Sequence, residues 1–510
     1  MPSPLPFTLS EPSLFHNDFY VDSQWAPAKS GQRFDVVDPG TGNTWTTCAD
    51  ATAEDVGDAV QSSYAAFAEY RKTTPRQRAQ WLMEWHRLLQ ASREDLAAIM
   101  VHETGKPMAE ARAEIDYGCT FIWWFAGEAE RAHGSTFRSA IAGRRTVTIK
   151  QPIGVVAALV PWNFPMALFV RKASGALAAG CTMVAKPSPE TPVSALTVAL
   201  LAVRAGFPRG VLNVLTTSLA NTPAVAEALC LDARVKKVTF TGSTRVGKIV
   251  EQLCARQLKK TTLELGGNCP FIVFDDADLG QAIPQLMALK WRHAGQACIT
   301  ANRVFVQSGI HDRFVQAFCA ETKKTLRMGH GSVADVNLGP VTTARSLDRA
   351  EAMYRDAVAK GAEAVLGNGT RAAAPAAAGA GQGGGGGGYF MEPTVLTKVT
   401  DDMALTQDEI FAPLLGVATF ETEEEVTARA NNTSMGLAAY VFTKDSDRLW
   451  RMLENIEAGM IGLNAGNSSA AEAPFGGIKE SGHGKESGKD VAIDEYLITK
   501  TGTMAISGLQ

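Results

Sequence analysis

The sequence predicts an α/β fold with two doubly wound domains in series. The chain has 510 residues, 45% hydrophobic and 20% charged, a composition typical of a globular protein with two or three domains. Short apolar runs such as residues 155–160 are nearly continuous, as expected of parallel strands that are buried on both faces. Helical stretches such as 173–179 and 194–204 separate these runs, and a second alternating set spans about 271–441.

The first part of the chain predicts helices. In residues 51–73 apolar side chains recur every three or four positions, as they do on one face of a helix. Thr74 followed by Pro75 is typical of a helix start, and Gly105 with Pro107 indicates where a later helix ends. Beyond residue 146, the expected strands of the first alternating set include 146–150, 155–160, 183–185, 211–214 and 238–240.

Charge and hydropathy exclude several classes of protein. Lys and Arg total 49 against 53 Asp and Glu, so the net charge of −4 gives no sign of a nucleic-acid-binding surface. Mean hydropathy is −0.04. No run approaches the roughly 18 apolar residues of a membrane span, so no association with a membrane is expected.

The cysteines predict reduced thiols. Eight cysteines include no CxxC pair, and their spacing fits neither a zinc site nor a disulfide framework, so no metal site is expected. Residues 1–30 contain one Lys and no Arg, which argues against a signal peptide or a basic transit peptide. We therefore expect the cytoplasm as the location.

One segment is of low complexity. Residues 371–388 are mostly Ala, Pro and Gly and end in six consecutive glycines. Such a tract buries too little apolar surface to offset the entropy lost on ordering. We expect a surface loop within about 370–388 that tolerates insertion, in preference to a functional lid.

A glycine-containing turn predicts a phosphate site. Residues 241–248, TGSTRVGK, follow the expected strand 238–240 and open a helix, whose N-terminus presents unpaired N–H groups to an anion. Gly242 and Ser243 lie at this turn. The segment matches most of a Walker A loop, but Ile249 stands where the Mg²⁺-binding hydroxyl belongs. A dinucleotide pyrophosphate therefore fits better than a P-loop nucleoside triphosphatase, which stays a remote alternative.

Three polar side chains are candidates for chemistry. Glu264 ends an expected strand beside Gly266, which leaves room for water next to a general base. Cys298 lies among small residues, where a substrate can approach a nucleophilic thiol. Asn163 follows strand 155–160 and offers a neutral donor to an oxyanion. The competing interpretations are an ordinary acidic residue in a turn for Glu264, a buried thiol for Cys298 and a rigid loop for Asn163.

Taken together and in order, these segments resemble the aldehyde dehydrogenase superfamily over about residues 15–505. The matching motifs are PWN at 161–163, KPSPETP at 186–192, FTGS at 240–243, ELGG at 264–267, GQAC at 295–298, EIFAP at 409–413 and PFGG at 474–477. The resemblance implies a Rossmann-like cofactor domain, a catalytic domain and a small β element that pairs subunits into a homodimer or homotetramer. The expected boundaries are 1–138 with 153–264, 265–465, and 139–152 with 483–510, respectively.

The same resemblance implies catalytic roles. Cys298 would attack the aldehyde carbon, and Asn163 would help to hold the oxyanion. After hydride passes to the nicotinamide, Glu264 would activate water to hydrolyse the thioester. A catalytically silent relative is disfavoured because all three residues are present.

The cofactor implied by the resemblance is NAD or NADP. Pro189 stands where NAD-preferring members usually carry Glu, and the loss of that acid removes a like-charge clash with a 2′-phosphate. The residues expected at the cofactor are Trp162, Lys186, Ser188, Gly242, Ser243, Gly266, Glu409 and Phe411.

Within the superfamily the likeness is greatest to succinate-semialdehyde dehydrogenases. Arg171, Arg292 and Ser469 match the residues that hold the far carboxylate of that four-carbon substrate, and arginine suits bidentate recognition of a carboxylate. The competing interpretation is that one or both arginines form structural ion pairs. Glutarate semialdehyde or a broad range of aldehydes stays open as the substrate.

Overall fold

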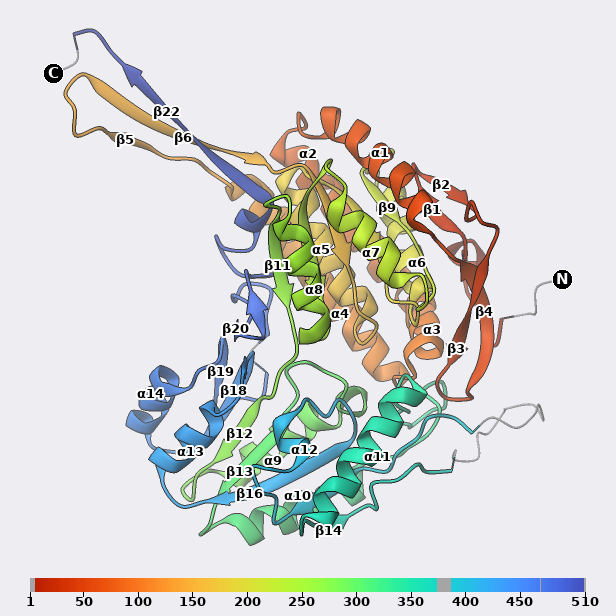
Figure 1. Ribbon diagram of the computed structural model, residues 1–510, viewed down its shortest axis with the longest axis vertical. Coiled ribbons are helices and arrows are strands. Elements are labelled where there is room, and N and C mark those ends of the chain that lie inside the picture. The colour runs from red at the N-terminus through yellow and green to blue at the C-terminus, as the bar shows by residue number, and fades with distance from the viewer. Residues whose placement is uncertain (1–4, 374–386, 468, 509–510) are drawn as a thin grey trace.

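The computed structural model describes residues 5–373, 387–467 and 469–508. Two lobes face each other, and a long β arm leaves the first lobe (Figure 1). Each lobe contains one mixed sheet with helices packed against it, and the two sheets comprise eight and seven strands. The predicted α/β class, with parallel strands alternating with helices in two successive sets, is confirmed.

The sheet of the first lobe has the strand order β2-β1-β9-β8-β7-β10-β11-β21. Its five central strands are parallel, whereas β1, β2 and β21 run antiparallel to their neighbours. The bounds are β1 (Phe19–Val21), β2 (Gln24–Ala26), β7 (Val155–Leu159), β8 (Thr182–Lys186), β9 (Leu212–Val214), β10 (Val235–Thr241), β11 (Lys260–Glu264) and β21 (Gly482–His483).

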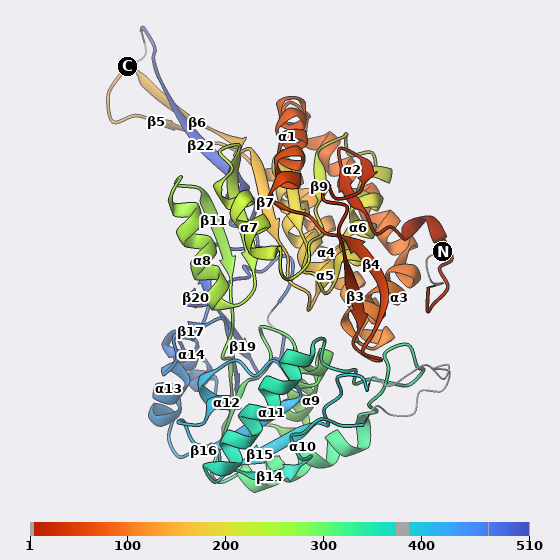
Figure 2. The ribbon, with the colours of Figure 1, turned by 45° about the vertical axis from the view of Figure 1, so that its right-hand side comes forward.

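Helices cover both faces of this sheet (Figures 1 and 2). They are α1 (Ala53–Tyr70), α2 (Pro75–Ala91), α3 (Arg93–Thr104), α4 (Met108–Arg131), α5 (Pro165–Ala179), α6 (Pro192–Arg204), α7 (Thr222–Leu231) and α8 (Thr244–Ala255). The predicted start of α2 is confirmed, because the Thr74 hydroxyl accepts from the Gln77 amide at 3.2 Å. The predicted end of α3 is also confirmed, with Gly105 left-handed at φ 79°.

The second lobe holds the sheet β14-β15-β16-β13-β12-β18-β19, parallel except at β14. Its strands are β12 (Pro270–Val273), β13 (Arg303–Gln307), β14 (Glu363–Leu366), β15 (Thr394–Thr397), β16 (Leu414–Phe420), β18 (Ala438–Phe442) and β19 (Met460–Leu463). The helices are α9 (Leu279–Lys290), α10 (His311–Thr325), α11 (Ala344–Ala359), α12 (Ala404–Gln407), α13 (Glu423–Asn431) and α14 (Ser446–Asn455).

The β arm consists of β5 (Thr136–Arg138), β6 (Arg144–Pro152) and β22 (Leu497–Ala505). β6 and β22 pair antiparallel along their whole length, from Pro152 opposite Leu497 to Arg144 opposite Ala505. Most residues of β22 are exposed, and both views show the arm projecting away from the lobes (Figures 1 and 2).

Smaller elements complete the fold: the hairpin β3 (Arg33–Asp38) with β4 (Asn43–Ala49), the pair β17 (Met435–Gly436) with β20 (Ile478–Lys479), and the 3₁₀ turns Pro12–Leu14, Arg292–Gly295 and Ile493–Tyr496.

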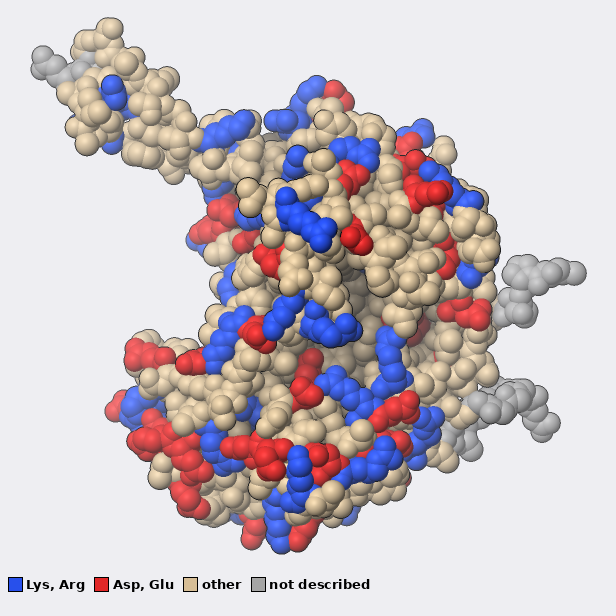
Figure 3. Space-filling model, viewed as in Figure 1, with Lys and Arg blue, Asp and Glu red and all other residues tan. Residues whose placement is uncertain are grey.

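Most of the predicted low-complexity loop, residues 374–386, lies outside the described residues. Among the residues that are described, no helix is both long and apolar enough to cross a bilayer. Acidic and basic side chains are both scattered over the two lobes on the face drawn in Figure 3.

Candidate active site

The predicted site residues meet at one edge of the first sheet. Asn163 follows β7, Lys186 ends β8, Ser243 follows β10 and Glu264 ends β11. These four strands are parallel neighbours, so their carboxyl ends lie along the same edge, where open α/β sheets bind ligands.

Two glycines allow the loop that carries Cys298 to pack against this edge. A Cβ atom on Gly267, just after β11, would lie 2.3 Å from the backbone oxygen of Cys298. Gly295 has φ +76°, and a Cβ there would lie 2.5 Å from the oxygen of Ala412. Because backbone atoms fill both spaces, a larger side chain at either position would displace the loop.

Gln296 fixes the Cys298 loop from inside. Its side-chain amide accepts from the Thr342 N–H at 2.9 Å and donates to the His293 oxygen at 3.0 Å. The Asn163 side chain donates to the Gln296 backbone oxygen at 3.0 Å. The structure therefore brings Asn163 and the Cys298 loop together, as the sequence predicts, and one N–H of the Asn163 amide is not needed for this bond.

The Cys298 thiol lies in a setting that disfavours its charge. Burial raises the pKa of Cys298, the Glu264 and Glu409 carboxylates raise it further, and the Arg171 guanidinium opposes them. Cys298 is the one half-buried cysteine, whereas the seven others are buried. Cys298 is thus the most exposed of the eight cysteine residues, and its surroundings favour the protonated thiol.

Glu264 keeps one oxygen available. Its side chain is buried, and one oxygen contacts Arg171 and accepts from the Thr241 hydroxyl at 3.4 Å. The other oxygen, Oε1, has no hydrogen-bond partner among the described residues. Burial raises the pKa of Glu264, Glu486 adds to this, and Arg171 and Lys172 oppose it. A buried carboxylate with a free oxygen can accept a proton from water.

A buried ion network behind Glu264 was not predicted from the sequence. Glu486 accepts from Arg171 Nε at 3.0 Å and from the Thr239 hydroxyl at 3.0 Å, and it also contacts Lys172. Burial raises the pKa of Glu486, but the Lys172 and Arg171 cations outweigh it and hold that pKa well below its usual range. Arg171 and Lys172 are consecutive cations in the otherwise apolar helix α5, which could have indicated buried acidic partners. No sequence feature identified Glu486 as one of them.

Arg171 is therefore paired with protein carboxylates, which agrees with the alternative that this arginine forms structural ion pairs. Arg292 differs. Its guanidinium lies 5.4 Å from the centre of the Phe164 ring, and its Nε is buried with no hydrogen-bond partner among the described residues. Ser469 contacts the hydroxyl of Tyr117, a residue that was not predicted from the sequence. Burial raises the pKa of Tyr117, and the charges of Arg171 and then Arg292 oppose it.

The residues predicted for the nicotinamide side also contact one another or their neighbours at this edge. Glu409 accepts from the Gly267 N–H at 3.3 Å, and a Cβ on Gly266 would lie 3.0 Å from its other oxygen. Burial raises the pKa of Glu409 to about 7. Phe411 has φ 55° and packs edge-on against Trp162 with 5.5 Å between ring centres.

The residues predicted for the adenosine and pyrophosphate side lie at the end of β8 and the start of α8. Lys186 is buried, and burial lowers its pKa to about 8 against the opposing charge of Glu190. Glu190 accepts from the Ser188 hydroxyl and from Arg345, both at 2.5 Å. Ser243 caps α8, since its hydroxyl accepts from the Val246 N–H at 3.4 Å. The buried cation and the open helix N-terminus fit a dinucleotide phosphate.

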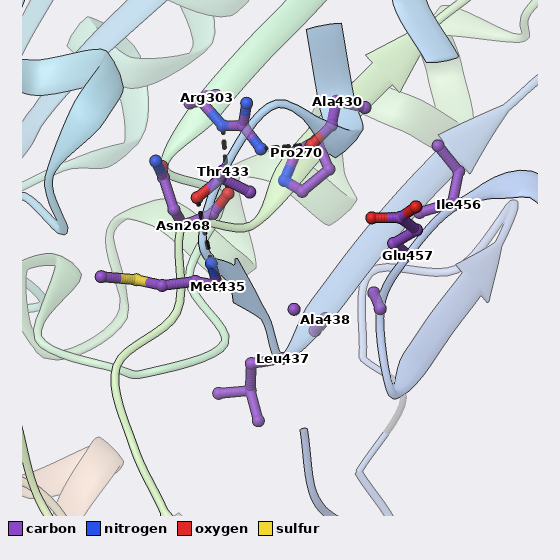
Figure 4. A pocket seen from close by; sticks show the side chains of 12 residues that line it. Asn268, Pro270, Arg303, Ala430, Thr433, Met435, Leu437, Ala438, Ile456 and Glu457 are labelled. Atoms are coloured by element: carbon purple, nitrogen blue, oxygen red, sulfur yellow. Dashed lines mark hydrogen bonds between the residues drawn. The ribbon is translucent and has the colours of Figure 1, made fainter. Parts of the chain in front are cut away.

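A separate pocket, drawn in Figure 4, does not carry this chemistry. Arg303 fills one side and donates to the backbone oxygens of Asn268 at 3.1 Å, Arg429 at 2.9 Å and Ala430 at 2.7 Å. Glu457 pairs with Lys479. The two charged side chains that line this pocket, Arg303 and Glu457, therefore already have partners within the protein.

Comparison with known proteins extends this description. The sequence profile described as "Aldehyde dehydrogenase family" matches residues 25–502. Human mitochondrial succinate-semialdehyde dehydrogenase is 43% identical over 488 residues, which cover 96% of this chain and 88% of the human protein. A protein named aspartate-semialdehyde dehydrogenase (non-phosphorylating) from Halomonas elongata is 42% identical over 492 residues, 96% of each chain. The crystal structure of succinate-semialdehyde dehydrogenase from Burkholderia pseudomallei gives a TM-score of 0.93 at 42% identity, covering 98% of this chain and 100% of that one.

Proposed function

We propose that this chain, which belongs to the aldehyde dehydrogenase family, oxidises succinate semialdehyde to succinate. It is an NAD(P)-dependent aldehyde dehydrogenase. The observation that carries the choice of substrate is Arg292, whose buried Nε lacks a partner among the described residues and which lies six positions before Cys298. A substrate carboxylate would supply the missing acceptor.

The first step is addition of Cys298 to the aldehyde. The Cys298 thiol gives its proton to water and its sulfur bonds to the carbonyl carbon, while the carbon–oxygen π bond breaks and leaves its electron pair on the oxygen as an oxyanion. Asn163 donates one side-chain N–H to the backbone oxygen of Gln296 at 3.0 Å. Its second N–H supports a role as the oxyanion donor, together with the backbone N–H of Cys298.

Hydride loss then converts the adduct into a thioester. When bound, the oxidised nicotinamide supplies the hydride acceptor, and its positive charge offsets the acidic surroundings that raise the pKa of Cys298. Glu409 would hold the nicotinamide ribose with Gly266 beside it, and Phe411 with Trp162 would flank the ring. The adenosine and pyrophosphate part of the site would be formed by Lys186, Ser188, Gly242 and Ser243.

Hydrolysis of the thioester is assigned to Glu264. Its unpartnered Oε1 would take a proton from water, whose oxygen attacks the thioester carbon and releases the Cys298 thiolate and succinate. Arg171, which contacts the same carboxyl group, would hold Glu264 in place.

The far carboxylate of the substrate is assigned to Arg292 and Ser469, with a contribution from Arg171, which also pairs with Glu264 and Glu486. Tyr117 supports this assignment because its hydroxyl contacts Ser469. The charges of Arg171 and Arg292 both lower the pKa of Tyr117 against the larger effect of burial. The relative from Halomonas makes aspartate semialdehyde the second candidate. That substrate carries an additional ammonium group beside its carboxylate, and the Arg292 guanidinium would repel it, whereas the charge of Arg171 is balanced by Glu264 and Glu486. Succinate semialdehyde therefore fits better.

The choice between NAD and NADP depends on the ribose end. Pro189 carries no charge, and the buried Lys186 cation would attract a 2′-phosphate. Glu190 is neutralised by Arg345 and occupied by Ser188. These contacts favour acceptance of NADP beside NAD.

The projecting arm supports an oligomer. β22 offers a long exposed strand, and the outer edge of such a strand is available for pairing with another chain. We infer a homodimer or homotetramer. The free cysteines support a reducing compartment such as the cytoplasm.

The test is an absorbance assay of NADH and NADPH formation. It crosses both cofactors with succinate, glutarate and aspartate semialdehydes and with butanal. The proposal requires the highest kcat/KM for succinate semialdehyde, whereas equal values for butanal would show an enzyme without carboxylate recognition.

A further inference from the structure

Two histidines and an aspartate from distant parts of the chain meet outside the active site. Asp38 ends β3, His102 lies on α3, and His330 lies in the loop after α10. One potential ligand atom from each lies within 4.8 Å of the other two. Their spacing along the chain gave no sign of this cluster, because only the fold brings positions 38, 102 and 330 together.

The two imidazoles are oriented by second hydrogen bonds. His102 Nδ1 lies 2.9 Å from the backbone oxygen of Ala98, which fixes the proton on Nδ1 and leaves the Nε2 lone pair free. His330 Nδ1 lies 2.7 Å from the Ser332 hydroxyl and accepts from the Ser332 N–H at 3.2 Å, so the ring proton lies on Nε2, which donates to Asp38 Oδ2 at 2.9 Å. A carbonyl behind the imidazole, as at His102, is an arrangement that metal-binding histidines use.

The backbone around the cluster is shaped to admit these rings. A Cβ on Gly40 would lie 2.1 Å from Cδ2 of His330, so the turn after β3 has room for that imidazole only with glycine. The Gly40 N–H donates to Asp38 Oδ1 at 2.8 Å and holds the carboxylate in place. Gly331 O accepts from the Met108 N–H at 3.0 Å, which ties the His330 loop to the first lobe.

The cluster is also within reach of solvent. His330 keeps 11% of its side chain exposed, which leaves a path for an ion, whereas Asp38 is 5% exposed.

From this geometry we propose that Asp38, His102 and His330 form a binding site for a divalent transition-metal ion such as Zn²⁺ or Co²⁺. Two imidazoles and one carboxylate are ligands that suit this class of ion, with bonds of about 2.0–2.2 Å, and water would complete the coordination. The ion takes the place of the proton on His330 Nε2, and that proton moves to Nδ1, where the Ser332 hydroxyl can accept it in place of the Ser332 N–H contact, so the imidazole stays neutral and no net proton is released. It links the β3–β4 hairpin and α3 to a loop of the second lobe.

The experiment uses the full chain with Cys298→Ser as background, which removes metal binding by the nucleophilic thiol. After treatment with EDTA and its removal, ZnCl₂ is titrated by calorimetry and CoCl₂ by visible absorption. His102→Gln, His330→Gln and Asp38→Asn are compared with His133→Gln, which changes an exposed histidine outside the cluster.

The expected result is one ion per chain, with affinity at least about 10-fold weaker in each cluster variant and unchanged in His133→Gln. ZnCl₂ should raise the melting temperature of the background protein but not of His330→Gln. Melting in EDTA verifies that each variant is folded. Ser332→Ala removes only the hydroxyl beside His330 Nδ1, so it should weaken binding less than His330→Gln does. Absence of binding, thiolate-to-cobalt charge-transfer bands, or equal affinity in all variants would overturn the site and leave only the Asp38–His330 hydrogen bond.

Discussion

The guanidinium of Arg171 pairs with the carboxylate of Glu264 inside the protein, where their side chains are 2% and 3% exposed. The Nε of the same guanidinium donates to Glu486 at 3.0 Å. Arg171 therefore binds the proposed general base and a second buried acid. Arg292 has no such protein partner for its Nε among the described residues. The two arginines assigned to one substrate group should behave differently.

Arg171→Gln should reduce turnover of every aldehyde. The substitution leaves Glu264 and Glu486 without a shared cation, and breaking a buried ion pair costs roughly 3–5 kcal/mol of stability. Steady-state kcat for succinate semialdehyde and butanal, with thermal melting, provides the measurement. A loss confined to succinate semialdehyde, with normal melting, would instead place Arg171 in the substrate clamp.

Arg292→Gln should affect substrates selectively. Loss of a charged partner for a buried carboxylate costs about 2 kcal/mol or more, so kcat/KM for succinate semialdehyde should fall at least about 30-fold. Butanal has no carboxylate and should lose little. Arg256→Gln, at an exposed position, is the matched control. Equal losses on both aldehydes would argue against carboxylate recognition by Arg292.

Glu264→Gln should separate the two halves of the reaction. Acylation needs Cys298 and the oxyanion donors, so a burst of NAD(P)H should persist while steady-state turnover falls. In the unmodified enzyme, hydrolysis requires ionised Glu264, and burial raises its pKa. The rate of hydrolysis should therefore rise with pH above the usual range of a glutamate. Rapid mixing across pH gives both readouts, and an unchanged steady state in the variant would remove Glu264 as the base.

Much of this fold follows from local sequence patterns. The run 155–160 is apolar because β7 is buried between β8 and β10, and Thr74 caps α2 because its hydroxyl is the acceptor nearest to the free N–H groups. Such patterns report burial and turn chemistry, which depend on neighbouring residues.

The buried ion network does not follow from such patterns. Glu486 lies more than 200 residues beyond Glu264, in a stretch without helical or strand periodicity, and only the return of the chain to β11 through β21 brings it behind the sheet edge. Tyr117 is likewise placed by the packing of α4 on α5. For Cys298, by contrast, the small neighbours required by its surroundings were visible in the sequence.

Lys186 should make NADP binding sensitive to pH. Burial lowers its pKa to about 8, so the free enzyme loses this cation as pH rises through that value. Affinity for the dianionic 2′-phosphate of NADPH should then decline between about pH 7 and pH 9, while affinity for NADH changes less. Fluorescence titration of both cofactors measures this difference. Parallel curves for NADH and NADPH would show that Lys186 does not contact the phosphate.

Gly267→Ala should displace the nucleophile. The added Cβ would lie 2.3 Å from the Cys298 oxygen, a backbone atom that cannot rotate away. Overpacking of this kind costs about 1–3 kcal/mol, and the shifted loop should also reduce the acylation burst. Gly57→Ala is the matched control, because nothing lies within 4 Å of a Cβ at that position of α1. Alanine there should stabilise the helix by about 0.5–1 kcal/mol. Denaturant unfolding with burst kinetics measures both effects, and wild-type behaviour of Gly267→Ala would show that the Cys298 loop does not depend on this close approach.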